Sequence, residues 1–275
     1  MTYTSAIQFT AMTPSHLQQA QRLSALAQWE HRLEDWEAML GLAQGITALD
    51  DRSNVIGTAL WFEHDHVTSI GAVLVDQCWQ RQGIGQTLMS RVMAASSHST
   101  FSLVATRQGE PLYRQMGFKQ TGAVRKYQGR VNERSPSPSV VSGLRRLQER
   151  DIHVLSTQCS AAFLSALARQ ATDAVLIERQ GNIHGAALCR PFGRGLQIGP
   201  VIAQDAIDAW AMIEALLDNA RGQIVRLDIA DQPDWEIPLT HWGMNATPPS
   251  QRLSFGPTPP SSSYVRFGLA SQAIG

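Results

Sequence analysis

One segment constrains this sequence more than any other: an apolar run, a glycine-containing loop and an amphipathic stretch in succession. Residues 67–75 form an apolar run of strand length, and Gln80-Arg81-Gln82-Gly83-Ile84-Gly85 comes shortly after it. Beyond the loop, Leu88, Met89, Val92 and Met93 are spaced to share one face of a helix. We therefore predict a strand, a glycine loop and a helix in that order.

This order of elements suits the binding of a pyrophosphate group. The N–H groups at a helix start and the positive end of the helix dipole point at one place, where an anion can sit. Gly83 and Gly85 allow close approach of the backbone, and Arg81 adds a positive charge. A Gly-x-Gly sequence also occurs in turns and at helix–sheet contacts that bind nothing, so the loop alone leaves both interpretations open.

A second motif gives the loop a context. Residues 70–77 and the loop resemble the coenzyme A loop of the GNAT superfamily of acyl-CoA N-acyltransferases. Residues 105–118 resemble the second signature of that family, in which a Tyr, here Tyr113, stands four residues before Gly-Phe. The Ala-Thr opening of this stretch, and Trp29 with Asp35-Trp36, resemble a tandem subfamily that carries a second GNAT-like domain.

The resemblance implies an α/β fold of the α+β type with two GNAT-like domains. Each would have a mixed, mostly antiparallel central sheet, flanked by helices, with a splayed fourth strand. Prolines among serines at 133–139 predict a linker between an N-terminal domain at 1–132 and a C-terminal domain at 140–275. In the second half, 195–202, 206–220 and 224–229 repeat a strand, helix and strand order.

The second domain is predicted to be a degenerate copy. Where the phosphate loop should lie, residues 203–208 contain no glycine and two acids, Asp205 and Asp208, which would repel pyrophosphate. Leu239 stands at the position that matches Tyr113. We therefore expect this domain to bind no coenzyme A and to have no catalytic role. Its expected role is to face the acceptor or to be structural.

Further elements of the first half follow from apolar periodicity and turn signals. We predict strands at 7–12, 46–49, 55–62, 101–105 and 119–127 and helices at 13–27, around Trp36–Leu40 and at 110–116. A hairpin that pairs Phe62 with Val67 would leave Glu63 as a solvated turn residue.

The activity that the resemblance implies is transfer of an acetyl group from acetyl-CoA to a primary amine by direct attack. The family's bulged strand carries over to Val73, Leu74 and Val75, whose N–H groups would bind the thioester carbonyl and pantetheine. Tyr113 matches the general acid that protonates the departing thiolate; the alternative is a packing residue. The predicted coenzyme A contacts are Val73, Leu74, Val75, Gln80, Arg81, Gln82, Gly83, Ile84, Gly85, Gln86 and Thr106.

The general base is not marked by any motif. Residues 67–75 contain no acid and no histidine. The nearby candidates are Glu30, His31, Glu34 and Asp35, and the second domain or a water chain are alternatives. We place Asp35 first, because it belongs to the Asp-Trp pair, although a helix cap is an equally simple role for it.

Composition limits the partners. The 275 residues include 23 Lys and Arg and 23 Asp and Glu, so the formal net charge is zero, which argues against a nucleic-acid or acidic-membrane surface. No stretch approaches the ~20 apolar residues of a membrane helix, and no signal-peptide pattern opens the chain. We expect a cytoplasmic monomer or homodimer that acts on a small-molecule amine or amino-acid-like acceptor rather than on a folded protein.

The cysteines and histidines do not have the spacing of a metal site. Cys78, Cys159 and Cys189 are too few and too dispersed for a disulfide framework or a zinc site, and we expect Cys78 to be a small buried side chain. His64 and His66 lack a third ligand nearby, so we predict no metal. The alternative to an enzyme is a non-catalytic coenzyme A binding or sensing module, which would have no need of Tyr113.

Overall fold

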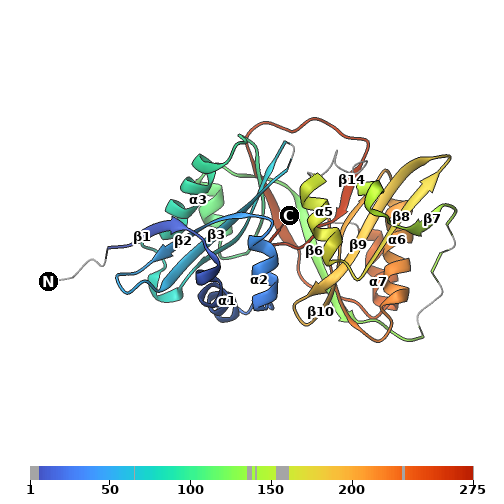
Figure 1. Ribbon diagram of the computed structural model, residues 1–275, viewed down its shortest axis with the longest axis horizontal. Helices are drawn as coiled ribbons and strands as arrows, with labels where there is room; N and C mark the ends of the chain where they lie inside the picture. The colour runs from blue at the N-terminus through green and yellow to red at the C-terminus, as the bar shows by residue number, and fades with distance from the viewer. Residues whose placement is uncertain are drawn as a thin grey trace. The chain divides into compact units, whose positions relative to one another are not determined.

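The computed structural model describes residues 6–64, 66–134, 138–139, 141–152, 161–230 and 233–274. The chain divides into two compact units, and Figure 1 labels many of their elements. Unit 1 runs to Lys119 and also contains residues 253–258 and the last residues from Ala273; unit 2 contains residues 120–252 and 259–272.

This division differs from the one expected at 133–139. Strand β6 (Lys119–Arg130) pairs antiparallel with β11 (Ile224–Ala230) from Val124 to Arg130, and these hydrogen bonds hold nearly all of β6 in unit 2. Within the expected linker, Ser135, Pro136 and Ser137 lie outside the described residues. A Pro-Ser segment marks a turn or loop in the chain, but it does not show which strands pair on either side of it.

Unit 1 has a mixed sheet in the order β1-β2-β3-β4-β5, followed by residues 253–255 of β13. Strands β1 to β4 are antiparallel neighbours and β5 is parallel to β4. The strands are β1 (Gln8–Ala11), β2 (Gln44–Leu49), β3 (Val55–Glu63), β4 (Thr68–Val75), β5 (Phe101–Ala105) and β13 (Ser250–Phe255); the helices are α1 (Leu17–Leu26), α2 (Leu33–Leu40), α3 (Ile84–Ala95) and α4 (Glu110–Gln115).

Helices cover both faces of this sheet. Residues Val55 to Phe62 of β3 are all buried, because α3 lies against one face and α1 with α2 against the other (Figure 1). The predicted face of α3 is confirmed: Leu88, Met89 and Val92 are buried in the core cluster that also contains Trp61, and Met93 is partly buried against it. The mixed, mostly antiparallel sheet flanked by helices is therefore the fold class that the sequence predicted.

The β3–β4 hairpin has a different register from the predicted one. Phe62 pairs with Ser69, and Glu63 pairs with Thr68, so the turn begins one residue later than expected. Glu63 is not a solvated turn residue, because its Oε1 accepts a hydrogen bond from the Ser97 N–H at 2.9 Å. Polar residues in a turn give few constraints on register, which was the cause of the error.

Unit 2 repeats the mixed architecture. Its sheet contains β6, β7 (Leu144–Arg146), β8 (Asp173–Arg179), β9 (Asn182–Phe192), β10 (Gly195–Ala203), β11, β12 (Asn245–Ala246) and β14 (Val265–Gly268). Helix α6 (Ala206–Asn219) and α7 (Glu236–His241) pack on one face, and α5 (Ala161–Gln170) contributes Leu164 and Ala168 to the other, beside Leu188 and Ile202 of β9 and β10. None of the helices in the described ranges has the length and apolar character needed to cross a bilayer.

Late residues of the chain complete unit 1. Leu253 is fully buried in the core cluster of unit 1, and the Phe255 ring lies 5.5 Å from the Phe118 ring and 6.3 Å from the Phe101 ring. A Cβ atom built at Gly71 would collide with the carbonyl oxygen of Ala273, so only glycine fits at this point of β4. The first unit is thus not a segment of sequence that ends near residue 132.

We expect Leu253→Ala to destabilise the protein by about 2–4 kcal/mol, because the substitution leaves a cavity in the core of unit 1. The matched control is Leu26→Ala, since Leu26 on α1 is 58% exposed; its effect should stay within about 0.5 kcal/mol. Urea unfolding of both variants measures the difference. Equal unfolding midpoints for Leu253→Ala and the wild type would show that β13 does not belong to the core of unit 1.

Candidate functional site

A bulge interrupts strand β4 in unit 1. Thr58 pairs with Leu74 and Leu60 pairs with Gly71, so Ala72 and Val73 together stand opposite the single residue between them on β3. Ala72 has a φ of 48°, in the left-handed region, and its carbonyl oxygen accepts a hydrogen bond from Thr58 Oγ1 at 2.7 Å. The bulge therefore lies at the start of the segment Val73, Leu74 and Val75, where the resemblance to the GNAT pattern implied it.

Strands β4 and β5 diverge soon after they begin. They pair in parallel only at Thr68 with Phe101 and at Ser69 with Ser102. Beyond Ser69, no strand in the described part of the chain pairs with β4 on that side. The predicted splay of the fourth strand is therefore present, and it leaves backbone groups of β4 open to a ligand that can hydrogen-bond to them.

The loop after β4 is fixed by side-chain amides. Gln80 Nε2 donates to the Val75 carbonyl at 3.1 Å, and Gln108 Nε2 donates to Gln80 Oε1 at 2.9 Å. Asp76 Oδ1 accepts from the Cys78 N–H at 2.9 Å, and Cys78 is exposed, not buried as expected. Gln80 therefore ties the end of β4 to the loop that precedes α4. Gln108 was not found from the sequence, because an exposed loop glutamine carries no pattern.

The start of α3 faces open space. Gly83 has a φ of 79° and caps the helix, and Arg81 has a φ of 61°; no heavy atom beyond the adjoining residues lies within 4 Å of a Cβ built at Gly83. The first hydrogen bond of the helix runs from the Thr87 N–H to the Gly83 carbonyl at 2.9 Å. The N–H groups of Ile84, Gly85 and Gln86 precede it, and no acceptor in the described ranges binds them.

Helix α4, which carries Tyr113, contacts the start of α3 through Leu112. A Cβ at Gly85 would be 3.2 Å from Leu112 Cδ2, and a Cβ at Gly109 would be 3.2 Å from the Tyr113 hydroxyl. Tyr113 is only 7% exposed, and burial raises the pKa of its phenol above the ordinary value of about 10. The hydroxyl is therefore protonated at neutral pH and can donate a hydrogen bond. Thr106 Oγ1 accepts from the Gly109 N–H at 3.1 Å, which supports the same turn.

Asp35 has a different environment from the one that a general base requires. Its Oδ2 accepts from the Arg32 N–H at 2.8 Å, and Arg32 Nη2 donates to its Oδ1 at 2.9 Å. The Asp35 side chain is 2% exposed, and the hydrogen bond to it raises the pKa of Arg32. Both oxygens are engaged at the start of α2. The geometry is that of a helix cap, the second of the two roles open from the sequence, and we do not propose Asp35 as the base.

In unit 2, the positions that correspond to the open ones of unit 1 are occupied by residues of unit 2 itself. Strand β14 lies between β10 and β11: Gly268 is paired with Val201 on one side and with Ile229 on the other. At the start of α6, Asp205 Oδ1 accepts from the Asp208 N–H at 2.8 Å, so a carboxylate of the chain itself caps this helix. Leu239, the counterpart of Tyr113, is fully buried. This unit retains neither the gap nor the open helix start.

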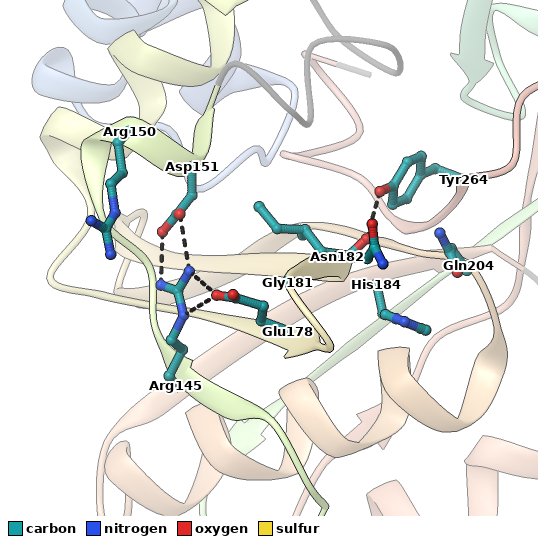
Figure 2. Close-up of a pocket in the computed structure, with 10 residues that line it drawn as sticks. Arg145, Arg150, Asp151, Glu178, Gly181, Asn182, His184, Gln204 and Tyr264 are labelled. Atoms are coloured by element: carbon teal, nitrogen blue, oxygen red, sulfur yellow. Dashed lines mark hydrogen bonds and ion pairs between the residues drawn. The ribbon is translucent and has the colours of Figure 1, made fainter.

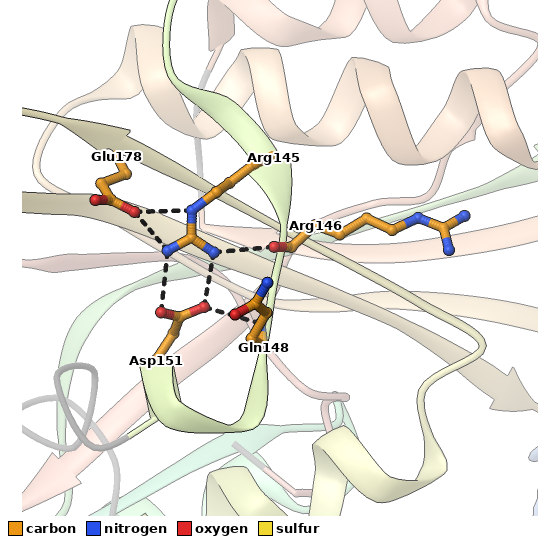
Figure 3. A network of polar contacts seen from close by, with 5 residues as sticks. All are labelled: Arg145, Arg146, Gln148, Asp151 and Glu178. Atoms are coloured by element: carbon orange, nitrogen blue, oxygen red, sulfur yellow. Dashed lines mark hydrogen bonds and ion pairs between the residues drawn. The ribbon is translucent and has the colours of Figure 1, made fainter. Parts of the chain in front are cut away.

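A cavity of about 550 Å³ in unit 2 is lined by polar side chains (Figure 2). Arg145 Nη1 binds Asp151 Oδ2 at 2.8 Å and Arg145 Nε binds Glu178 Oε2 at 2.8 Å, as Figure 3 shows. The Tyr264 hydroxyl donates to the Ile183 carbonyl at 2.6 Å. Because the Arg145, Asp151, Glu178 and Tyr264 side chains already bind partners within the protein, we assign them a structural role. They stabilise β7 and the β8–β9 turn. No group of three or more potential metal ligands occurs among the described residues; Cys159 lies outside them.

The chain belongs to the GNAT acetyltransferase family and carries two domains of it: two models of the acetyltransferase (GNAT) domain match residues 43–120 and 158–264. YitH of Bacillus subtilis strain 168, named as an uncharacterized N-acetyltransferase, is 28% identical over 225 residues, 78% of this chain and 79% of that protein. The tandem arrangement that the sequence implied is thereby confirmed.

Solved structures share the fold of the whole chain. A protein from Pyrococcus horikoshii, named as a candidate acetyltransferase, superimposes with a TM-score of 0.77 at 17% identity, over 100% of this chain and 98% of that one. A GCN5-related N-acetyltransferase from Sphaerobacter thermophilus gives a TM-score of 0.64 at 15% identity, with coverage of 91% and 95%. At these identities the likeness establishes the fold alone.

The ion pairs of Arg145 predict a pH-dependent stability. The hydrogen bond from Arg145 holds the pKa of Asp151 below its ordinary value of 3.8. A lowered pKa adds stability above the unfolded pKa of about 3.9 and loses it as the pH falls through the folded value. We therefore expect Asp151→Asn to destabilise the protein by about 1–3 kcal/mol at pH 7, with the difference from wild type shrinking below about pH 4.

Urea unfolding between pH 3 and pH 7 measures this difference. The control is Glu149→Gln, which removes an exposed carboxylate of the same turn and should change stability by less than about 0.5 kcal/mol. A difference for Asp151→Asn that stays constant across the pH range would mean that the Arg145 pair does not stabilise the folded state.

Proposed function

We propose that the protein is an acetyl-CoA-dependent N-acetyltransferase in which unit 1 binds the donor. The observation that carries the proposal is the combination of a bulged β4 that diverges from β5 with an unobstructed start of α3. In this proposal the N–H groups from Gln80 to Gln86 bind the pyrophosphate, with Thr106 at the edge of the site. The pantetheine and the thioester carbonyl bind to Val73, Leu74 and Val75.

The chemistry needs a proton at the sulfur. The amine attacks the thioester carbonyl, a new C–N bond forms, the C–S bond breaks, and the amine nitrogen loses a proton. In this proposal Tyr113, whose phenol is protonated at neutral pH, hydrogen-bonds to the departing sulfur and supplies its proton, and the tyrosinate is then reprotonated from water. The proton of the amine goes to a base on α1–α2, in unit 2 or in a water chain, as the sequence left open.

The acceptor in this proposal is a small amine or an amino-acid-like molecule. The neutral charge balance of the chain gives no reason to expect a nucleic acid or an acidic membrane as a partner. Incubation of a metabolite extract with the protein and labelled acetyl-CoA, followed by mass spectrometry, identifies the acceptor. Retention of acetyl-CoA without any labelled product would favour the alternative of a coenzyme A sensing module.

We predict that Gly83→Glu abolishes acetyl-CoA binding in calorimetry, because it places a side chain and a negative charge at the pyrophosphate position. Gly181→Glu is a matched control. Gly181 has a φ of 78°, close to the 79° of Gly83, and a Cβ at either position meets nothing within 4 Å. Both variants therefore suffer similar backbone strain, and only Gly83→Glu should lose the ligand. Unchanged affinity in Gly83→Glu would overturn the site.

Tyr113→Phe should lower kcat about 10²- to 10⁴-fold and leave the affinity for acetyl-CoA close to wild type, since it removes a proton donor and little contact area. The control is Tyr264→Phe, which removes the hydroxyl that donates to Ile183 in unit 2 and should keep wild-type turnover. Steady-state kinetics and calorimetry on both variants separate chemistry from binding. Full turnover in Tyr113→Phe would return Tyr113 to a packing role.

A further inference from the structure

The backbone of Val75, the last residue of β4, faces the gap between β4 and β5. The Asp76 N–H donates to the Ile56 carbonyl on β3 at 2.8 Å. In an antiparallel pair, successive residues of a strand direct their N–H and C=O groups alternately toward the partner strand and away from it. Because Asp76 faces β3, the N–H and C=O of Val75 point away from β3, to the side on which β5 has diverged.

Two side-chain amides occupy this end of the gap. Gln80 Nε2 donates to the Val75 carbonyl at 3.1 Å, and Gln108 Nε2 donates to Gln80 Oε1 at 2.9 Å. Gln108 belongs to the loop that follows β5 in the chain. The series Val75, Gln80 and Gln108, which we call the amide bridge, therefore connects the end of β4 to the segment after β5. It replaces the direct hydrogen bonds that two fully paired strands would form.

The direction of both hydrogen bonds in the amide bridge follows from the first one. A backbone carbonyl only accepts, so the Gln80 amide must present its NH₂ group to Val75, and its Oε1 is then left to accept from Gln108. The side chain at position 108 must therefore supply a donor. A side chain without a donor breaks the bridge, whereas a lysine ammonium, which has only donors, can keep it.

The loop that carries Gln108 has hydrogen bonds of its own. The N–H groups of Gly109 and Glu110 both donate to the Thr106 carbonyl, at 3.0 and 2.9 Å. Gln108 itself is exposed, and an exposed amide hydrogen bond contributes little to the free energy of unfolding. The backbone of the loop therefore keeps its shape without the Gln108 side chain, and the effect of the bridge falls on the position of Val75.

We infer that Gln108 is a positioning residue for the acyl donor: through Gln80 it holds the backbone of Val75 in the place where the pantetheine arm binds. The inference rests on the proposed function, which assigns the pantetheine to Val73–Val75 and the pyrophosphate to the start of α3. The role of Gln108 concerns the pantetheine arm of the donor and not its pyrophosphate.

Calorimetry with acetyl-CoA and with ADP separates these two parts of the donor, because ADP carries a pyrophosphate group and no pantetheine. Gln108→Met removes the donor and keeps a side chain of similar length. It should weaken acetyl-CoA binding about three- to tenfold and leave the ADP affinity within about twofold of the wild type. Gln108→Lys keeps a donor to Gln80 Oε1 and should restore the wild-type ratio of the two affinities. The matched control is Gln115→Met on α4, an exposed position outside the bridge, which should leave both affinities unchanged.

Three results would overturn the inference. Equal losses of acetyl-CoA and ADP affinity in Gln108→Met would assign Gln108 to the pyrophosphate loop. Wild-type affinity for acetyl-CoA in that variant would show that the bridge does not position Val75. A ratio in Gln108→Lys that matches the one in Gln108→Met would show that the hydrogen bond to Gln80 is not the cause. Failure of the wild type itself to bind acetyl-CoA is a separate result, which would refute the proposed function and the inference with it.

Discussion

Strands β4 and β5 hydrogen-bond over only two residue pairs, and the arrangement of unit 1 depends on this early divergence. The bulge at Ala72 turns the second half of β4 away from its parallel neighbour, and the hydrogen bond from Thr58 holds the bulged carbonyl. The loop that contains Gly83 and the start of α4 then lie at the open end of the strands. A flat, fully paired sheet would leave no backbone groups for a ligand.

The two units meet this constraint in different ways. Where a parallel neighbour diverges, the backbone N–H and C=O groups of the remaining strand lose their hydrogen-bond partners. These groups must then be paired with another strand, with water or with a ligand. Unit 2 uses its own β14, paired on both sides at Gly268, and the carboxylate of Asp205 caps α6. Unit 1 keeps the same positions open, with a glycine at the helix cap. The order of elements is shared, and the two units differ in what occupies the gap and the start of the following helix.

Local sequence signals predicted much of unit 1. Strand β5 was predicted at its observed limits, and the buried face of α3 followed from the spacing of Leu88, Met89 and Val92. The β8–β9 hairpin was missed, because β9 is buried along most of its length and its apolar residues do not alternate. Contacts between distant segments leave no local pattern in the sequence. The packing of Leu253 in the core of unit 1 is an example.

The residues of the candidate site could be predicted from the sequence only where they belong to a short motif. The glycine loop and Tyr113 are short patterns with a physical reason at each position. Asp35 was placed by its neighbour Trp36, and its actual partner, Arg32, stands three residues before it, within reach of a cap.

Amide hydrogen exchange with and without acetyl-CoA tests most directly whether the gap in unit 1 is the ligand site and its counterpart in unit 2 is closed. The account predicts that acetyl-CoA slows exchange at Val73–Val75 and at Ile84–Gln86, and leaves exchange at Val201–Ala203 and at the start of α6 unchanged. Protection that appears in β10 and α6, or that is absent from β4 and α3, would contradict it.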